Sequence, residues 1–109
     1  MTNASALLDA LAEPTRRVIV ERLSTGPAAV TELARDLPIS RSAVSQHLQV
    51  LKAAGLVSDR AEGTKRVYRV NPEALAIIRA YFDSFWQRSL AAFEQAATGH
   101  TATASEEPA

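Results

Sequence analysis

The sequence contains no cysteine, only one tryptophan and few other aromatic residues, and it has no long apolar run. The lack of cysteine excludes disulfides, thiolate-ligated metals, iron–sulfur clusters and cysteine nucleophiles. No apolar stretch approaches the roughly 20 residues that a membrane-spanning helix needs, and residues 1–9 lack the pattern of a secretory signal. These absences predict a cytoplasmic chain without a signal peptide or a membrane span.

The chain also lacks net charge, because its 12 Lys and Arg residues balance its 12 Asp and Glu residues. The charges are nevertheless unevenly distributed. Residues 31–70 carry seven basic residues against four acidic ones, whereas residues 71–109 carry two against five. A basic middle segment can form a phosphate-binding surface while the rest of the protein has no attraction for nucleic acid.

Large apolar side chains are scarce as well. Hydrophobic residues make up 47% of the 109 residues, but 21 of them are alanine. A chain of this length corresponds to about one domain, and a core this small buries only a modest fraction of its surface. We therefore expect a second copy of the chain to cover part of the apolar surface, in a homodimer.

Proline, glycine and capping residues divide the first forty residues into three predicted short helices. The first covers residues 5–12. The second begins at Pro14, a residue favoured in the first helical turn, and ends before Gly26 after about ten residues. Thr31 is suited to be the N-cap of a third helix, which Pro38 ends.

The fourth predicted helix, over residues 41–54, has the most informative pattern. Ser40 can cap its start, and Gly55 stands where a left-handed residue would end it. At about 100° per residue, one arc is apolar and the other polar. The apolar arc comprises Ala43, Val44, His47, Leu48, Val50, Leu51 and Ala54. The polar arc comprises Arg41, Ser42, Ser45, Gln46, Gln49 and Lys52, without an acid, so it can approach base edges in a DNA groove.

A β-hairpin is predicted next, from strands over 57–60 and 67–70 that flank a loop containing Gly63. Its loop is basic. We expect Lys65 and Arg66 to contact phosphates or the minor groove. The alternative is an ordinary solvated strand edge, whose charges discourage aggregation.

The last predicted helix begins after Asn71, at Pro72, and runs to about residue 97. Five of the six aromatic residues lie on it, in an apolar band wider than a small domain can cover alone. We assign this band to a dimer interface in preference to an effector pocket. Residues 98–109 are small, polar and acidic, so we expect a disordered tail after a folded domain over residues 1–97.

Two helices joined by a tight turn and followed by a basic hairpin predict a winged helix-turn-helix. Three segments resemble the ArsR/SmtB family of bacterial winged-helix repressors: residues 13–17 (EPTRR), 31–34 (TELA) and 40–57 (SRSAVSQHLQVLKAAGLV). The third is the most specific, and the resemblance covers roughly residues 5–97. It implies a mainly α fold in which a small β-hairpin stands between the fourth and fifth helices.

The resemblance also implies a homodimer formed by the first and last helices, with each recognition helix in a major groove of a palindromic operator. The interface would then consist of Leu7, Leu8, Leu11, Phe82, Phe85, Trp86 and Phe93. The family's base-reading positions correspond to Arg41, Ser42, Ser45 and Gln46. Contacts to the DNA backbone would come from Thr31, Ser40, Gln49, Lys52, Lys65 and Arg66. Arg41 can reach guanine or clamp a phosphate, and the amide of Gln46 suits adenine.

Many members of this family sense metal ions, but the corresponding ligands are missing from this sequence. The thiolate site would need cysteines where Ala29, Thr31 and Ala34 stand. The other common site would need histidines where Phe85 and Ala96 stand, and Asp83 alone is one carboxylate, which does not make a site. We therefore predict no metal effector and no cofactor.

The hydroxyl and imidazole groups of the fourth helix do not form a catalytic triad. His47 lies in the apolar arc, away from Ser42 and Ser45, so we expect a structural or phosphate-contacting role for it and no enzyme activity. The sequence thus predicts a DNA-binding transcriptional regulator, specifically a metal-independent (auto)repressor. The alternative is a winged-helix protein-interaction module without specific operator recognition.

Overall fold

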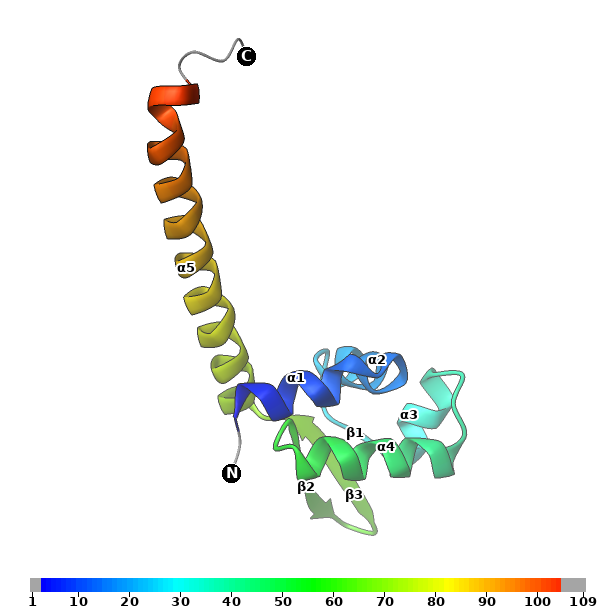
Figure 1. Cartoon of the computed structure of the whole chain (residues 1–109). Coiled ribbons are helices and arrows are strands. Elements are labelled where there is room, and N and C mark those ends of the chain that lie inside the picture. Colours follow the sequence, from blue (N-terminus) through cyan, green and yellow to red (C-terminus); the bar gives the residue numbers. More distant parts are fainter. Residues whose placement is uncertain (1–2, 105–109) are drawn as a thin grey trace. The chain divides into compact units, whose positions relative to one another are not determined.

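The computed structural model describes the backbone of residues 3–104 and the side chains of residues 3–98. The chain divides into two units between Ile78 and Arg79. The first unit holds four helices, three strands and the first turns of a fifth helix, and the second holds the rest of that helix (Figure 1). Within the described residues, no helix has the length and apolar character to cross a membrane.

The first two helices, α1 (Ala4–Ala12) and α2 (Pro14–Leu23), begin at side-chain caps. The Asn3 carboxamide oxygen accepts a hydrogen bond of 2.8 Å from the Ala6 N–H, so α1 starts one residue before the predicted range. The carboxylate of Glu13 caps α2. Pro14 is the first residue of α2, as predicted, because a proline needs no N–H partner there.

Helix α3 (Val30–Asp36) begins earlier than predicted, and Thr31 is not its cap. Ala29 occupies the cap position, and its N–H donates a 2.9 Å hydrogen bond to the carboxylate of Glu32. This acid three residues on satisfies a free backbone donor, as the returning half of a capping box does. Thr31 is therefore the second residue of the helix, with an exposed side chain.

The predicted hairpin is confirmed, but it is longer than expected and belongs to a three-stranded antiparallel sheet of order β1-β3-β2. Strands β2 (Val57–Glu62) and β3 (Lys65–Val70) leave only Gly63 and Thr64 in the turn. Gly63 has a φ of +64°, which is the requirement of a type II′ turn with glycine first. The sequence did not predict β1 (Ala28–Ala29), which pairs with β3.

The base of the hairpin is closed by Asn71, the residue after β3. Its N–H donates to the carbonyl of Leu56 at 2.9 Å, and its side-chain amide donates to the carbonyl of Gly55 at 2.8 Å. Gly55 has a φ of +86°, the left-handed conformation that the sequence predicted at the end of the fourth helix. The two ends of the hairpin are thus joined to each other.

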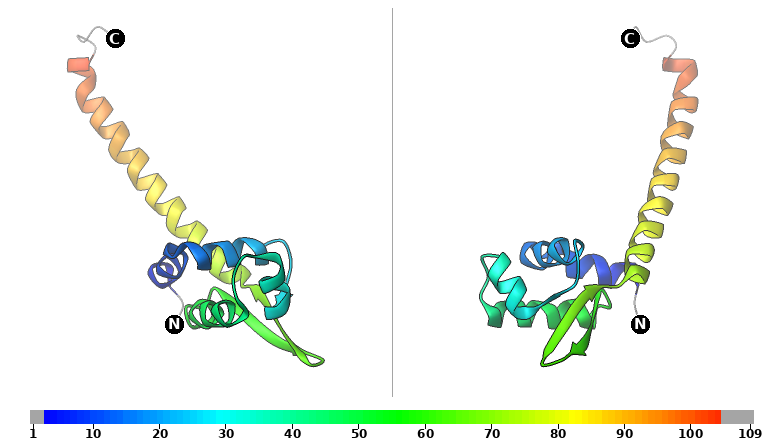
Figure 2. Two further views of the ribbon diagram at one scale, coloured as in Figure 1. Left: turned by 90° about the vertical axis from the view of Figure 1, so that its right-hand side faces the viewer. Right: turned by 180° about the vertical axis from the view of Figure 1, so that it is seen from behind.

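The core of the first unit lies between the helices and the sheet. Among residues 3–98, every residue that is buried as a whole is hydrophobic. The cluster comprises Leu7, Ala10, Ile19, Val20, Leu23, Ala28, Leu33, Val44, Leu48, Leu51, Leu56, Val57, Tyr68 and Ala74. Helix α4 (Arg41–Ala53) contributes three of these residues, so its orientation is fixed by the core. In Figures 1 and 2, α4 and the hairpin lie on the side of this unit opposite α1 and α2, and the hairpin tip extends past the helices.

Helix α5 (Pro72–Ala104) is longer than predicted. Its expected end near residue 97 is wrong, and the backbone of residues 98–104, which we assigned to a disordered tail, is helical. Alanine has the strongest helix propensity, and it recurs often enough here to carry the helix past Gly99. Residues 105–109 of the expected tail lie outside the described residues.

Candidate nucleic-acid interface

Helix α4 is fixed at both ends and along one face. The hydroxyl of Ser40 accepts a 3.2 Å hydrogen bond from the Ala43 N–H, as the N-cap prediction required. On the inner face, Val44, Leu48 and Leu51 are completely buried. These contacts hold the opposite face of the helix toward solvent.

The outer face of α4 carries the polar residues that the sequence placed there. All six side chains of the polar arc are exposed: Arg41, Ser42, Ser45, Gln46, Gln49 and Lys52. Val50 differs from the prediction, because its side chain is 44% exposed and does not belong to the core. This polar arc, the exposed row of α4, therefore offers amide, hydroxyl and cationic groups with no acid among them. Such groups suit the base edges and the phosphates of DNA.

His47 joins α4 to the start of α2. Its Nδ1 lies 3.7 Å from the carboxylate of Glu13, and both side chains are partly buried. Backbone hydrogen bonds from Thr15 and Arg16 lower the pKa of Glu13, so this carboxylate stays ionised beside the imidazole. This arrangement gives His47 a structural contact, away from the exposed Ser42 and Ser45. Within residues 3–98, no three His, Asp or Glu side chains come together as metal ligands.

A nearly buried carboxylate connects α4 to the hairpin. Asp59 of β2 has a side chain only 4% exposed, and it pairs with Lys52 at 2.9 Å and with Arg66 at 3.0 Å. Hydrogen bonds from Lys52 and then from Arg66 hold the pKa of Asp59 below its ordinary value, against the effect of burial. Sequence reasoning named the two cations and missed the acid. The signal was the alternation of β2, which places Asp59 on the same face as the buried Val57.

The tip of the hairpin and the first turn of α3 share one hollow of about 190 Å³. Thr31 lines it from α3, and Lys65 and Arg66 line it from the hairpin. The structure thus brings together three of the residues that the sequence assigned to the DNA backbone, although they come from segments more than thirty positions apart. The cations and the hydroxyl around this hollow are groups that donate hydrogen bonds to phosphate oxygens.

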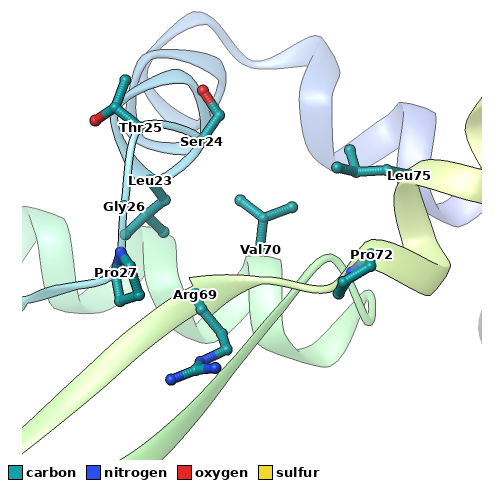
Figure 3. Close-up of a pocket in the computed structure, with 9 residues that line it drawn as sticks. All are labelled: Leu23, Ser24, Thr25, Gly26, Pro27, Arg69, Val70, Pro72 and Leu75. Carbon is teal, nitrogen blue, oxygen red and sulfur yellow. The ribbon is translucent and has the colours of Figure 1, made fainter.

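A larger hollow of about 430 Å³ lies on another part of the first unit, between the end of α2 and the start of α5. Figure 3 shows that the side chain of Arg69 points away from Leu23 and Val70. The hydroxyls of Ser24 and Thr25 donate to backbone carbonyls at the end of their own helix. The lining is therefore mainly apolar, and it includes none of the residues predicted to contact DNA.

The residues assigned to a dimer interface have different environments. Leu7 is completely buried in the core of its own protomer, so the prediction that it contacts a second copy is wrong. It faces inward because α1 packs against α2, and its apolar stripe is used first to cover the core of the same chain. Leu8 and Leu11 remain partly exposed. In the second unit the four predicted side chains are between 48% and 69% exposed: Phe82, Phe85, Trp86 and Phe93.

Comparison with known proteins relates this geometry to transcriptional regulators. A helix-turn-helix domain family matches residues 11–60. The HTH-type transcriptional regulator Rv2034 of Mycobacterium tuberculosis is 62% identical over 86 residues, which cover 79% of this chain and 80% of that protein. The HTH-type transcriptional repressor SmtB of Mycobacterium tuberculosis is 43% identical over 75 residues, covering 69% of this chain and 56% of that protein.

Solved structures give the same result. A possible transcriptional regulator for arsenical resistance matches with a TM-score of 0.66 and 50% identity, covering 78% of this chain and 93% of the other. An ArsR-like transcriptional regulator from Rhodococcus sp. RHA1 matches with a TM-score of 0.72 and 32% identity, covering 86% and 92%. These relatives are transcriptional regulators, and they support the DNA-binding prediction over the interaction-module alternative. The chain belongs to the ArsR/SmtB family of winged helix-turn-helix, DNA-binding transcriptional regulators.

Proposed function

We propose that the protein is a metal-independent repressor that binds a palindromic operator as a homodimer in the cytoplasm and can repress its own gene. The observation that carries this proposal is the exposed row of α4, which contains no acid and lies on the same side of the unit as the basic hairpin tip. A surface of this kind attracts phosphates and leaves short polar side chains free to reach bases.

Base recognition is assigned to the first half of α4. Arg41, Ser42, Ser45 and Gln46 are exposed there, and a recognition helix contacts bases mainly through its N-terminal residues. The amide of Gln46 offers a donor and an acceptor, which match the major-groove edge of adenine. Arg41 can pair with guanine or bind a phosphate.

Backbone contacts are assigned to the residues that surround this row. Thr31, Lys65 and Arg66 line one hollow and can bind a single phosphate group from two sides. The others are exposed residues of α4 and its cap: Ser40, Gln49 and Lys52. These contacts would position the protein on the duplex without reading its sequence.

The homodimer is assigned to the exposed aromatic side chains of α5, with a contribution from Leu8 and Leu11 of α1. Exposed aromatic residues at three- and four-residue spacings form an apolar band that a second copy would cover. A twofold dimer presents two recognition helices, so its operator is palindromic. On this proposal residues 1–97 form the DNA-binding and dimerisation domain.

Metal independence follows from the donor set. The chain has no cysteine, and its one histidine with a described side chain, His47, is engaged with Glu13. A zinc ion needs about four ligands in tetrahedral geometry, and a single imidazole does not supply them. We therefore expect zinc and chelator to leave the affinity for DNA unchanged.

Fluorescence anisotropy on two labelled duplexes tests the proposal. One duplex comes from the region upstream of the gene, or from a selection of bound genomic fragments, and the other has a scrambled sequence. We expect discrimination on the order of a thousandfold and a steep dependence on salt, with and without chelator. Equal weak binding to scrambled DNA and to every selected fragment would refute operator recognition.

Two substitutions separate base reading from backbone contact. Gln46→Ala should reduce discrimination between the duplexes by about 1–3 kcal/mol, because a base contact is lost. Lys65→Ala should weaken binding to both duplexes about equally and make the salt slope shallower by about one. The opposite assignment of these two effects would show that the roles of α4 and the hairpin are exchanged.

A further inference from the structure

We propose that Asp59 is a positioning residue of the DNA-binding surface: it holds one cation of the recognition helix and one of the hairpin in a fixed arrangement, and thereby favours operator over random DNA. This inference rests on the proposed function. It adds an acidic residue to a surface whose other assigned members are basic or neutral.

The geometry is a bridge. Lys52 approaches one oxygen of the carboxylate at 2.9 Å, and Arg66 approaches the other oxygen at 3.0 Å. Lys52 lies in the last turn of α4, Asp59 on β2 and Arg66 on β3, so the bridge spans three elements. The side chain of Asp59 is only 4% exposed, which shields the contacts from water and salt more than a surface pair is shielded.

Both cations keep donors for DNA while they are held. Their side chains are about half exposed, 47% for Lys52 and 56% for Arg66. An ammonium group has three N–H donors and a guanidinium five, so one contact to Asp59 leaves the others for phosphate oxygens. A long side chain that is already fixed loses less conformational freedom when it binds.

The carboxylate also removes one unit of positive charge from the surface. Attraction to DNA of any sequence depends on the number of cations that meet phosphates, whereas operator binding also needs those cations at defined positions. Loss of the charge of Asp59 would therefore strengthen binding to random duplex. It would weaken binding to the operator, because α4 and the hairpin would no longer be joined in one arrangement.

The same hairpin contains a matched control. Glu62 pairs with Arg60 at 2.9 Å, but both residues lie on β2, and their side chains are 46% and 65% exposed. This pair therefore does not connect one strand or helix to another, unlike the pairs of Asp59. Glu62→Gln therefore makes the same charge change as Asp59→Asn and leaves the bridge between α4 and the hairpin intact.

The test measures the ratio of affinities for the operator and the scrambled duplex over a salt series. For Asp59→Asn we expect severalfold tighter binding to the scrambled duplex, a steeper salt slope and a ratio at least tenfold lower than in the wild type. For Glu62→Gln we expect a similar gain on both duplexes and an unchanged ratio. Equal effects of the two variants on the ratio would overturn the proposal, because charge alone would then explain them.

A second variant keeps the test independent of any loss of folding in Asp59→Asn. Arg66→Gln removes the hairpin cation and leaves the pair of Lys52 with Asp59, so the ratio should fall here too. In the double variant, which combines Asp59→Asn with Arg66→Gln, the ratio should fall no further than in the worse single variant. The reason is that both substitutions break the same bridge. Additive effects would overturn the proposal. A wild type that does not discriminate at all would instead overturn the proposed function, and this inference with it.

Discussion

Replacement of Trp86 by aspartate is expected to dissociate the proposed homodimer. Trp86 is 61% exposed in the single chain. A tryptophan side chain buries up to about 250 Å², so roughly 150 Å² is open to a partner. At about 25 cal/mol per Å², covering this area stabilises the dimer by about 4 kcal/mol per protomer.

Twofold symmetry places two such side chains in the dimer, which doubles the loss to about 8 kcal/mol as an upper estimate. Partial coverage and ordering of side chains reduce the value that binding shows. A loss of half the upper estimate, about 4 kcal/mol, would still raise the dimer Kd by nearly three orders of magnitude. Operator affinity should fall as well, because a monomer has lost the contacts of the second half-site.

Sedimentation velocity at micromolar concentration measures this change. Gln87→Asp is the control, since it adds the same charge at the next position, about 100° around the helix and outside the aromatic band. We expect dimers for the wild type and for Gln87→Asp, and monomers for Trp86→Asp. The reasoning is refuted by a Trp86→Asp protein that stays dimeric, or by equal dissociation of the control.

Three further predictions concern stability. Leu48→Ala removes a completely buried side chain from the inner face of α4 and should cost about 2–5 kcal/mol in urea unfolding, whereas Gln49→Ala should change stability little. Ser40→Ala removes the N-cap of α4 and should cost about 1 kcal/mol, against no measurable loss for Ser42→Ala; equal losses would contradict the capping role. The lowered pKa of Asp59 means that its ionised form stabilises the fold above the ordinary carboxyl range, and that this contribution is lost as pH falls through and below that range. Urea unfolding from pH 7 to pH 3 should therefore show a weaker pH dependence in Asp59→Asn than in the wild type.

The helix boundaries near the recognition helix could be predicted because they depend on local chemistry. Ser40, Gly55 and Pro14 act within one turn of their own positions, and each lies where expected. The outer face of α4 followed from helical periodicity alone. The exception is Val50, which lies at the edge of the apolar arc, where periodicity does not decide burial.

The features that the sequence did not predict depend on partners distant in the chain. Ala28 and Ala29 form a strand because Tyr68 and Val67 lie beside them, and two alanines carry no strand signal of their own. The role of Asp59 likewise depends on two cations from other elements. Leu7 was assigned to an interface because an apolar stripe does not say whether the same chain or a second copy covers it.

The closure of the hairpin at Gly55, Leu56 and Asn71 separates the contacts that its tip makes from the position of α4 and the core. The lower part of the hairpin is also held by Val57 and Tyr68 in the core and by Asp59 against Lys52. Residues can therefore be inserted or exchanged at the tip, around Gly63 and Thr64, without displacing α4 or the start of α5. Variation in the length and sequence of the tip can retune the contacts of a regulator with DNA while the core and the recognition helix stay the same.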